Sequence, residues 1–522
     1  MMAQYIKPQD IQDGEQRYEV LMIAAGKDGE VVTATNPFPV TLGSENITIT
    51  GDVNVGTTVS VTSTPEDPVH THVTEVGTSG ILVRPNLPIS IQTAAGVENS
   101  AANPIYTSST GALSFNATAS DAFGRLRTSI PLTLFDSSHR YSDNGLWDTS
   151  TVSGGSTAFD ADQGLVNLTL TTAANASVIR ETSKVFAYQP GKSLLVLNTF
   201  VPATPKANLL QRIGYFGTRN GMYYEINGTT AAFVKRSAVT GSIVETKISR
   251  LGGVYGAGDT GWNIDQLDGT GPSGLTFAND KAQILWMDIE WLGLGTVRMG
   301  FVIDGQFVHC HSFHHANIVT STYITTACLP LRYEITNTAA TATASTLKQI
   351  CSSVISEGGY NLHGIQQAVG TPITTPRTLT TAGTYYPVIS VRLKTSPDRL
   401  DAVAILSALS IMGQGNGVNF NWRIISKGAT TGGSWLSAGT NSSVDYNISG
   451  TSFSGGTILA SGFMNSSNQG SPTVDIPKDA LFKFQMERNS FTSTPYELTL
   501  VVAAGTGTEL VFASLDWEEI TR

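Results

Sequence analysis

Two pairs of histidines in the sequence have a spacing that could bind a metal ion. His70 and His72 form one His-x-His motif, and His309 and His311 form another. Alternate residues of a β-strand lie on the same face of a sheet, so both imidazoles of a pair would face one site. In a three-fold fibre, one pair from each chain would surround an axial metal with six imidazoles. Each pair also fits the simpler interpretation of histidines on the polar face of a strand.

The residues before the second pair argue against a metal there. Asp304-Gly305 separates the apolar runs 297–303 and 306–313, which is typical of a two-residue hairpin turn. Counting back from this turn places Arg298 opposite His311. The fixed positive charge of an arginine would repel a metal ion. We therefore expect no metal at the second pair, and the first pair remains the metal candidate.

Two carboxylates could support acid–base chemistry. Asp288 and Glu290 alternate in the segment ILWMDIEWL (284–292), beside Trp286. Glycoside hydrolases use a pair of carboxyl groups of this kind. Alternate Cα atoms of a strand lie roughly 7 Å apart, which does not exclude such a role. Any solvated strand face offers similar pairs, however, and we expect a structural or arginine-paired role.

No other segment matches a known catalytic motif. Ser273 lies in GTGPSG, which lacks the Gly-x-Ser-x-Gly spacing of a nucleophile elbow and is better interpreted as a tight turn. The sequence contains no Walker A motif and no dinucleotide-binding fingerprint. We therefore predict a protein that is not an enzyme and uses no cofactor.

Trp435 is the candidate for a receptor contact. It stands in the loop-like segment GATTGGSWLSAGTNSS (428–443). An exposed tryptophan in such a loop would bind a sugar or a protein receptor. Alternatively, the residues SWL begin a strand and Trp435 fills a core, which is the interpretation we favour.

The overall composition excludes several classes of protein. Charged residues make up 14% of the 522 residues, and the net charge is −10 without any cluster of Lys and Arg. A nucleic-acid partner requires a basic face, so we expect none. No run approaches 18 apolar residues, so we expect no membrane insertion. The three cysteines, Cys310, Cys328 and Cys351, form no disulfide framework. Together with a polar N-terminus that lacks a secretory signal, this indicates assembly in a reducing compartment.

The N-terminal part has a repeating pattern. In ITITGDVNVGTTVSV (47–61) the apolar residues occupy odd positions and recur in pairs every six residues. Such strands have one apolar face, and stacked rungs or neighbouring chains must cover it. We expect an attachment segment over 1–40 and an extended β shaft over 41–117. A flexible Ser/Thr linker is the alternative, although linkers do not keep a six-residue apolar repeat.

The remainder predicts two globular β domains, over 118–362 and 363–522. Short alternating segments are separated by polar turns, which is typical of β-sandwiches and jelly rolls. The fold class is therefore all-β: an extended N-terminal β-repeat region followed by two β-sandwich or jelly-roll-like domains. The segment LKQICSSVI (347–355) could form either a strand or a helix. The clearest strand signals are SLLVLNTF (193–200), ILWMDIEWL (284–292), VRMGFVI (297–303), YPVISVRL (386–393), FNWRII (420–425), LFKFQM (481–486), YELTLVVAA (496–504) and LVFASLDW (510–517).

Nine blocks of the sequence carry a resemblance to known proteins: IAAGKDGEVVTATNPFPVT (23–41), SDAFGRLRTSIPLTLFDSSHRYSDNGLW (120–147), YQPGKS (188–193), IGYFGTRNGMYYEING (213–228), GWNIDQLDGTGPSG (261–274), ILWMDIEWLGLGTVRMGFVIDG (284–305), LPLRYEI (329–335), LKQICSSVISEGG (347–359) and SLDWEEI (514–520). As a set, they resemble virion structural proteins of tailed bacteriophages, a family described as structural, tail-fibre or fibre-like. The order of the blocks is also that of the family, and the resemblance covers nearly the whole chain. No single block indicates a chemistry.

The resemblance implies a non-enzymatic virion protein that assembles in the bacterial cytoplasm. We expect a homotrimeric appendage whose N-terminal part contacts other virion proteins and whose β domains project outward. Host attachment through a surface glycan or protein is the natural use of such domains, by analogy. The alternatives are a head fibre or decoration protein without a receptor role, and a capsule-depolymerising tailspike. The family supplies no catalytic or binding residues.

Overall fold

The computed structural model describes residues 105–107, 113–115, 128–361, 363–466, 473–475 and 484–520. His70, His72, the segment 1–40 and most of the predicted shaft lie outside these residues. Within the shaft, β1 (Ile105–Thr107) and β2 (Leu113–Phe115) pair antiparallel. The chain divides into a unit of residues 1–127 and a unit of residues 128–522.

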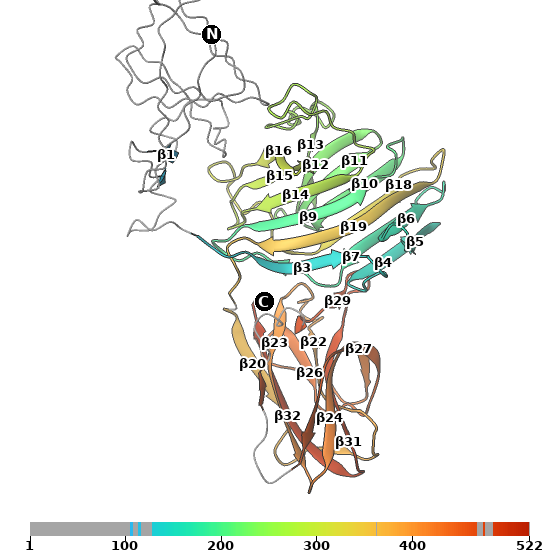
Figure 1. Ribbon diagram of the computed structural model, residues 1–522, viewed down its shortest axis with the longest axis vertical. Helices are drawn as coiled ribbons and strands as arrows, with labels where there is room; N and C mark the ends of the chain where they lie inside the picture. The colour runs from blue at the N-terminus through green and yellow to red at the C-terminus, as the bar shows by residue number, and fades with distance from the viewer. Residues whose placement is uncertain are drawn as a thin grey trace, which may run out of the picture. The chain divides into compact units, whose positions relative to one another are not determined.

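The predicted all-β class is confirmed. The described residues form strands joined by turns and no α-helix (Figure 1). None of them therefore forms a helix with the length and hydrophobicity that a membrane crossing requires. The segment 347–355, which the sequence left open between helix and strand, is a strand, because its alternate residues are buried in the core.

A first sandwich, here called the central sandwich, contains the strands between residues 132 and 356. Two antiparallel sheets form it, and the short strands β8 (Phe186–Ala187) and β17 (Cys328–Leu329) pair beside them. One sheet has the order β13 (Val244–Ser249), β12 (Thr230–Ser237), β11 (Gly221–Asn227), β10 (Leu209–Phe216), β18 (Leu331–Asn337), β7 (Ser177–Thr182) and β4 (Trp147–Val152). The other has the order β16 (Gln306–Phe313), β15 (Val297–Ile303), β14 (Gln283–Ile289), β9 (Leu194–Val201), β19 (Ser345–Ser356), β6 (Leu165–Leu170) and β5 (Gly155–Asp160), with β3 (Leu132–Ser138) on β19.

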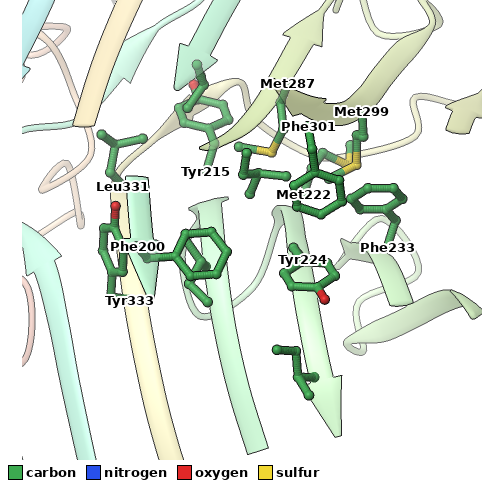
Figure 2. Packing of buried hydrophobic residues seen from close by; sticks show 14 of the residues in the cluster. Phe200, Tyr215, Met222, Tyr224, Phe233, Met287, Met299, Phe301, Leu331 and Tyr333 are labelled. Carbon is green, nitrogen blue, oxygen red and sulfur yellow. The ribbon is translucent and has the colours of Figure 1, made fainter. Parts of the chain in front are cut away.

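Aromatic rings and methionines from both sheets fill the centre of this sandwich (Figure 2). Tyr224 on β11 meets Phe301 on β15 edge-to-face, with 5.2 Å between the ring centroids. Phe233 on β12 stacks on Trp262 at 4.4 Å. Such ring pairs stabilise the core beyond the contribution of the apolar area that they bury. One face of the 297–313 hairpin belongs to this core: Val297, Met299, Phe301, Val308 and Cys310 are buried, and Ile303 packs against them half-buried.

A second sandwich, here called the C-terminal sandwich, contains the strands from residue 365 to residue 519. It has its own apolar core, in which Trp517 is fully buried. One sheet has the order β20 (Ile365–Gly370), β32 (Glu509–Glu519), β23 (Ala404–Gln414) and β28 (Thr473–Asp475), with β21 (Arg377–Leu379) on β32. The other has the order β25 (Leu436–Ser437), β26 (Val444–Asn447), β22 (Tyr386–Leu393), β31 (Glu497–Ala504), β24 (Asn419–Thr431) and β27 (Ser452–Asn465).

Buried ion pairs join the two sandwiches within the 128–522 unit. Glu181 on β7 bonds Arg332 on β18 and Arg488 on β29 (Arg488–Asn489), each at 3.0 Å. Arg488 also bonds Asp401 at 2.8 Å. A small apolar cluster at the same seam includes Val185 and Ile405. The seam therefore combines burial with specific charge pairing.

One predicted strand is wrong in its described part. The prediction covered 481–486, but residues 484–486 form only an isolated bridge, between Gln485 and Ile405. The side-chain amide of Gln485 donates a hydrogen bond to the carbonyl of Val185 in the central sandwich. The segment thus contributes to the seam and not to a sheet.

Candidate functional site

An open pocket of about 490 Å³ lies on the central sandwich where three strands begin or end. The first residues of β9 and β15 and the last residues of β14 meet there, because Ile289 pairs with both Leu194 and Val297. The volume falls within the usual range of small-molecule sites. Its walls come from two loops and these strand ends: Tyr188, Gly191, Lys192, Ser193, Asp288, Glu290, Leu292, Thr296 and Arg298.

The first loop is a tight turn whose form follows from its sequence. In Gln189-Pro190-Gly191-Lys192, the Lys192 N–H donates to the Gln189 carbonyl at 3.2 Å. Gly191 has a φ of 82°. Proline followed by a glycine with positive φ is the signature of a type II turn. The turn delivers Lys192 to the pocket wall directly before β9 begins.

Lys192 carries an ammonium group that has no partner among the described residues. Its Nζ is buried and makes no hydrogen bond there. The aliphatic stem packs on Gly358, where an added Cβ would lie 2.5 Å from the Lys192 Cγ. A buried amine without an acceptor is unfavourable, so this group can gain from a ligand that accepts hydrogen bonds. Lys192 was not among the residues predicted from the sequence, and the one sequence signal for this loop was its QPGK turn.

Asp288 and Arg298 face each other across β14 and β15. Asp288 is buried and accepts a hydrogen bond from the Arg298 guanidinium, whereas Arg298 is largely exposed. The pairing fits the arginine-paired role that the sequence analysis expected for this carboxylate. Because Arg298 already balances the charge of Asp288, this carboxylate is less available to bind a ligand.

Glu290 lies outside the strand in which the sequence placed it. β14 ends at Ile289, so the prediction that Asp288 and Glu290 share one strand face is wrong. The chain turns there because Leu292 and Gly293 take positive φ, and the carbonyl of Trp291 accepts from the N–H groups of Leu294 and Gly295. Glu290 is exposed and accepts a hydrogen bond from the Thr296 N–H at 3.2 Å. Both carboxylates nevertheless line the same pocket.

A stacked pair of rings holds the loop that carries Glu290. His315 and Tyr323 lie parallel with 3.9 Å between their centroids. The Nδ1–H of His315 donates to the Gly295 carbonyl at 2.6 Å, and the Lys235 ammonium then donates to Nε2 at 3.1 Å. This arrangement requires a neutral imidazole. Burial lowers the pKa of His315 to about 4.

We expect the central sandwich to lose stability as the pH falls from about 6.5 to about 4. The unfolded chain takes up a proton near pH 6.5, whereas folded His315 takes it up only near 4, so acid favours unfolding. His315 alone should contribute on the order of 2 to 3 kcal/mol at pH 4. Urea midpoints of wild type and His315→Gln, measured between pH 7.5 and 4, should show a shallower pH slope for the variant. Equal slopes would contradict this assignment.

The His309 and His311 pair does not share a face. A β-bulge between Met299 and Gly300 shifts the register, so His309 pairs with Gly300 and His311 with Met299. The predicted pairing of Arg298 with His311 is therefore wrong, and Arg298 pairs with Ser312. His309 lies near Trp286 at 5.8 Å, whereas His311 stacks on the core residue Phe233 at 6.4 Å. Among the described residues, no group of three or more His, Cys, Asp or Glu could hold a metal ion.

Trp435 is neither a core residue nor a free surface ring. It is half-buried, directly before β25, and the guanidinium of Arg392 lies over it at 3.9 Å. The expectation that Trp435 fills a core is therefore wrong, because the loop places the ring over Arg392 of β22 and outside the apolar cluster. The stacked arginine occupies one face of the ring and leaves less of it for a receptor.

Comparisons with known proteins identify no family. No protein-family model matches the chain, and no curated protein is similar to it. Several solved structures are similar in part. A protein of unknown function from Shewanella oneidensis MR-1 is 15% identical, with 44% of this chain and 88% of that one covered and a TM-score of 0.29. Arcelin-5, a lectin-like defense protein from Phaseolus vulgaris, is 8% identical, with 44% and 99% covered and a TM-score of 0.28. A GH16 protein from the Bacteroides ovatus mixed linkage glucan locus is 10% identical, with 42% and 99% covered and a TM-score of 0.28.

Proposed function

We propose that the protein is a non-enzymatic structural component of a tailed-bacteriophage virion, a trimeric appendage that contributes to host attachment. The N-terminal part contacts other virion proteins, and the two sandwiches present binding surfaces to the host. The pocket on the central sandwich is the contact site. A head fibre or decoration protein without a receptor role is the alternative.

One observation carries this proposal. Every residue that lines the pocket belongs to two of the blocks that resemble the phage proteins, YQPGKS (188–193) and ILWMDIEWLGLGTVRMGFVIDG (284–305). Gly358, on which Lys192 packs, belongs to a third block, LKQICSSVISEGG (347–359). Two blocks that are far apart in the sequence thus meet at one open site, and a third supports it from behind, which favours a shared binding role for the blocks.

The virion role predicts that the protein is present in purified particles and takes part in adsorption. Mass spectrometry of purified virions should detect the chain, and antibody against residues 128–522 should label the particle surface. Purified protein added before infection should reduce phage adsorption by competing for the host. Particles that lack the protein would contradict the virion assignment. Labelled particles whose adsorption is not reduced by the competitor would favour the decoration alternative.

A trimer is expected because the repeats predicted to form the shaft would have one apolar strand face that their own chain cannot cover. Light scattering of the purified full chain should give three times the mass of 55.3 kDa. Replacing Val53 and Val55 with aspartate should dissociate the trimer, since buried unpaired charges cost several kcal/mol per chain. A stable folded monomer of the wild-type chain would contradict the oligomer.

We expect no hydrolysis of host polysaccharide. General acid catalysis needs a carboxyl that keeps its proton, usually in an apolar environment. Asp288 instead accepts a hydrogen bond from the Arg298 guanidinium, and Glu290 is exposed, so neither lies in an apolar environment. A reducing-sugar assay on host capsule should therefore read as the buffer control does. Sugar release that Asp288→Asn and Glu290→Gln both abolish would instead support a depolymerase.

A further inference from the structure

The pocket has no net charge but presents two polar groups of opposite kind. Lys192 and Arg298 oppose Asp288 and Glu290, and Arg298 is already bonded to Asp288. This leaves one buried ammonium without a partner and one exposed carboxylate that is in no ion pair within the described ranges. A ligand that complements both must accept hydrogen bonds at one point and donate them at another.

A hydroxyl group can do both, because it has one donor and two acceptor positions. Adjacent hydroxyl groups on a sugar ring can accept from Lys192 and donate to Glu290 at the same time. Ser193 and Thr296 add further side-chain hydroxyls to the wall. Leu292, with 57% of its surface exposed, offers an apolar contact for the C–H face of a ring. The lining thus combines a few polar groups with apolar surface, as small-molecule sites do.

The charges disfavour an acidic ligand. A ligand carboxylate at Lys192 would also face the carboxylate of Glu290, which is in no ion pair among the described residues. The whole chain carries a net charge of −10, so a polyanionic chain would also be repelled at long range. A neutral polyhydroxylated ligand meets neither obstacle.

We propose that this pocket binds a neutral sugar unit of a host-surface glycan, held between the carboxylate of Glu290 and the ammonium of Lys192, which turns out of its buried position to meet the ligand. The inference rests on the proposed role in host attachment, for which it names the ligand class. Gly358 is a positioning residue, because only a residue without a side chain lets the Lys192 stem lie where it does.

The test is binding of the full chain to an array of neutral and uronic-acid-containing oligosaccharides, followed by calorimetry on the best neutral ligand. We expect binding to neutral glycans only. Lys192→Met keeps the stem and removes the ammonium, and it should weaken binding about tenfold or more, as should Glu290→Gln. Gly358→Ala should weaken binding although every charge remains. The control is Lys281→Ala, which removes a lysine that is 72% exposed and whose ion pair within the described ranges is with its neighbour Asp280, and it should bind as wild type does.

The ligand class and the attachment role can fail independently of each other. Thermal unfolding should first show that Lys192→Met and Gly358→Ala fold as wild type does. Binding that Lys192→Met and Glu290→Gln leave unchanged, or binding to acidic glycans alone, would overturn the inference. A protein that competes for adsorption but binds no glycan on the array would overturn it too and leave the attachment role standing. Lys192-dependent binding of neutral glycan by a protein that is absent from virions would support the ligand class and reject the virion role.

Discussion

Replacing Arg488 with alanine should destabilise the 128–522 unit by about 3 to 5 kcal/mol. Arg488 is buried between the two sandwiches, and it bonds both Glu181 and Asp401. Its removal leaves Glu181, itself almost fully buried, with Arg332 as the remaining partner among the described ion pairs. Urea denaturation of the full chain would measure the loss. Arg219→Ala, at an exposed turn, is the matched control and should change the unfolding free energy by less than about 0.5 kcal/mol.

The pH dependence of this variant tests the cause of the loss. Burial raises the pKa of Glu181, and the guanidinium groups of Arg488 and Arg332 oppose that shift. Without Arg488 the pKa should rise further, because one of two opposing cations is gone. The variant can then protonate Glu181 in mild acid and relieve the unpaired charge, so its deficit should be smaller at pH 5 than at pH 7.5. The double variant Glu181→Gln with Arg488→Met should be more stable than Arg488→Met alone. A deficit that is independent of pH and of Glu181 would mean that packing, and not charge, holds this seam.

Replacing Trp517 with alanine should destabilise the C-terminal sandwich by about 3 to 5 kcal/mol. The ring is fully buried in the apolar core, and its Nε1–H donates to Glu519 at 3.0 Å. Truncation leaves a cavity and removes a hydrogen bond from Glu519, a buried carboxylate that also accepts from the Ser443 N–H at 2.8 Å. Hydrogen exchange should show a larger loss of protection in β23, β31 and β32 than in the strands of the central sandwich, because residues of these three strands belong to the core that Trp517 fills.

Trp435→Ala is the matched control for the same residue type. Its ring is half-buried and stacks on Arg392, so its loss should reduce the unfolding free energy by only about 0.5 to 1 kcal/mol. The loss of unfolding free energy in Trp517→Phe should lie between those of Trp517→Ala and Trp435→Ala, because phenylalanine fills most of the space but cannot donate a hydrogen bond to Glu519. Equal losses for Trp517→Ala and Trp435→Ala would show that the two rings do not differ in burial in solution.

The sequence by itself determined the features that depend on local pattern. Alternation with period two predicted the strands now seen as β15, β16 and β22 with their observed bounds. The Asp304-Gly305 pair predicted the turn, and Ile303 does pair with Gln306. Asp304 and Gly305 both have a positive φ, which this two-residue turn requires. These signals succeed because side-chain alternation and turn geometry involve neighbouring residues only.

The tertiary structure decided the register beyond the turn. A Cβ at Gly300 would collide with the carbonyl oxygen of Val308, so the backbones approach closely at this glycine and the strand bulges. The bulge separates His309 from His311, which strand alternation had placed on one face, and it shifts Arg298 away from the pairing with His311 that counting from the turn predicted. A glycine inside a strand was the available sequence signal for a bulge, but it does not give the direction of the shift.

The candidate site depended on the tertiary structure to a greater degree. The sequence identified Asp288 and Glu290 but could not bring Lys192 beside them, since these residues are about a hundred positions apart. Nor could it pair Glu181 with Arg488, which lie 307 residues apart. Contacts of this range depend on how sheets stack and where strands end. Local propensity therefore predicted the all-β class and several of the strands, whereas packing between distant segments produced the pocket and the charged seam.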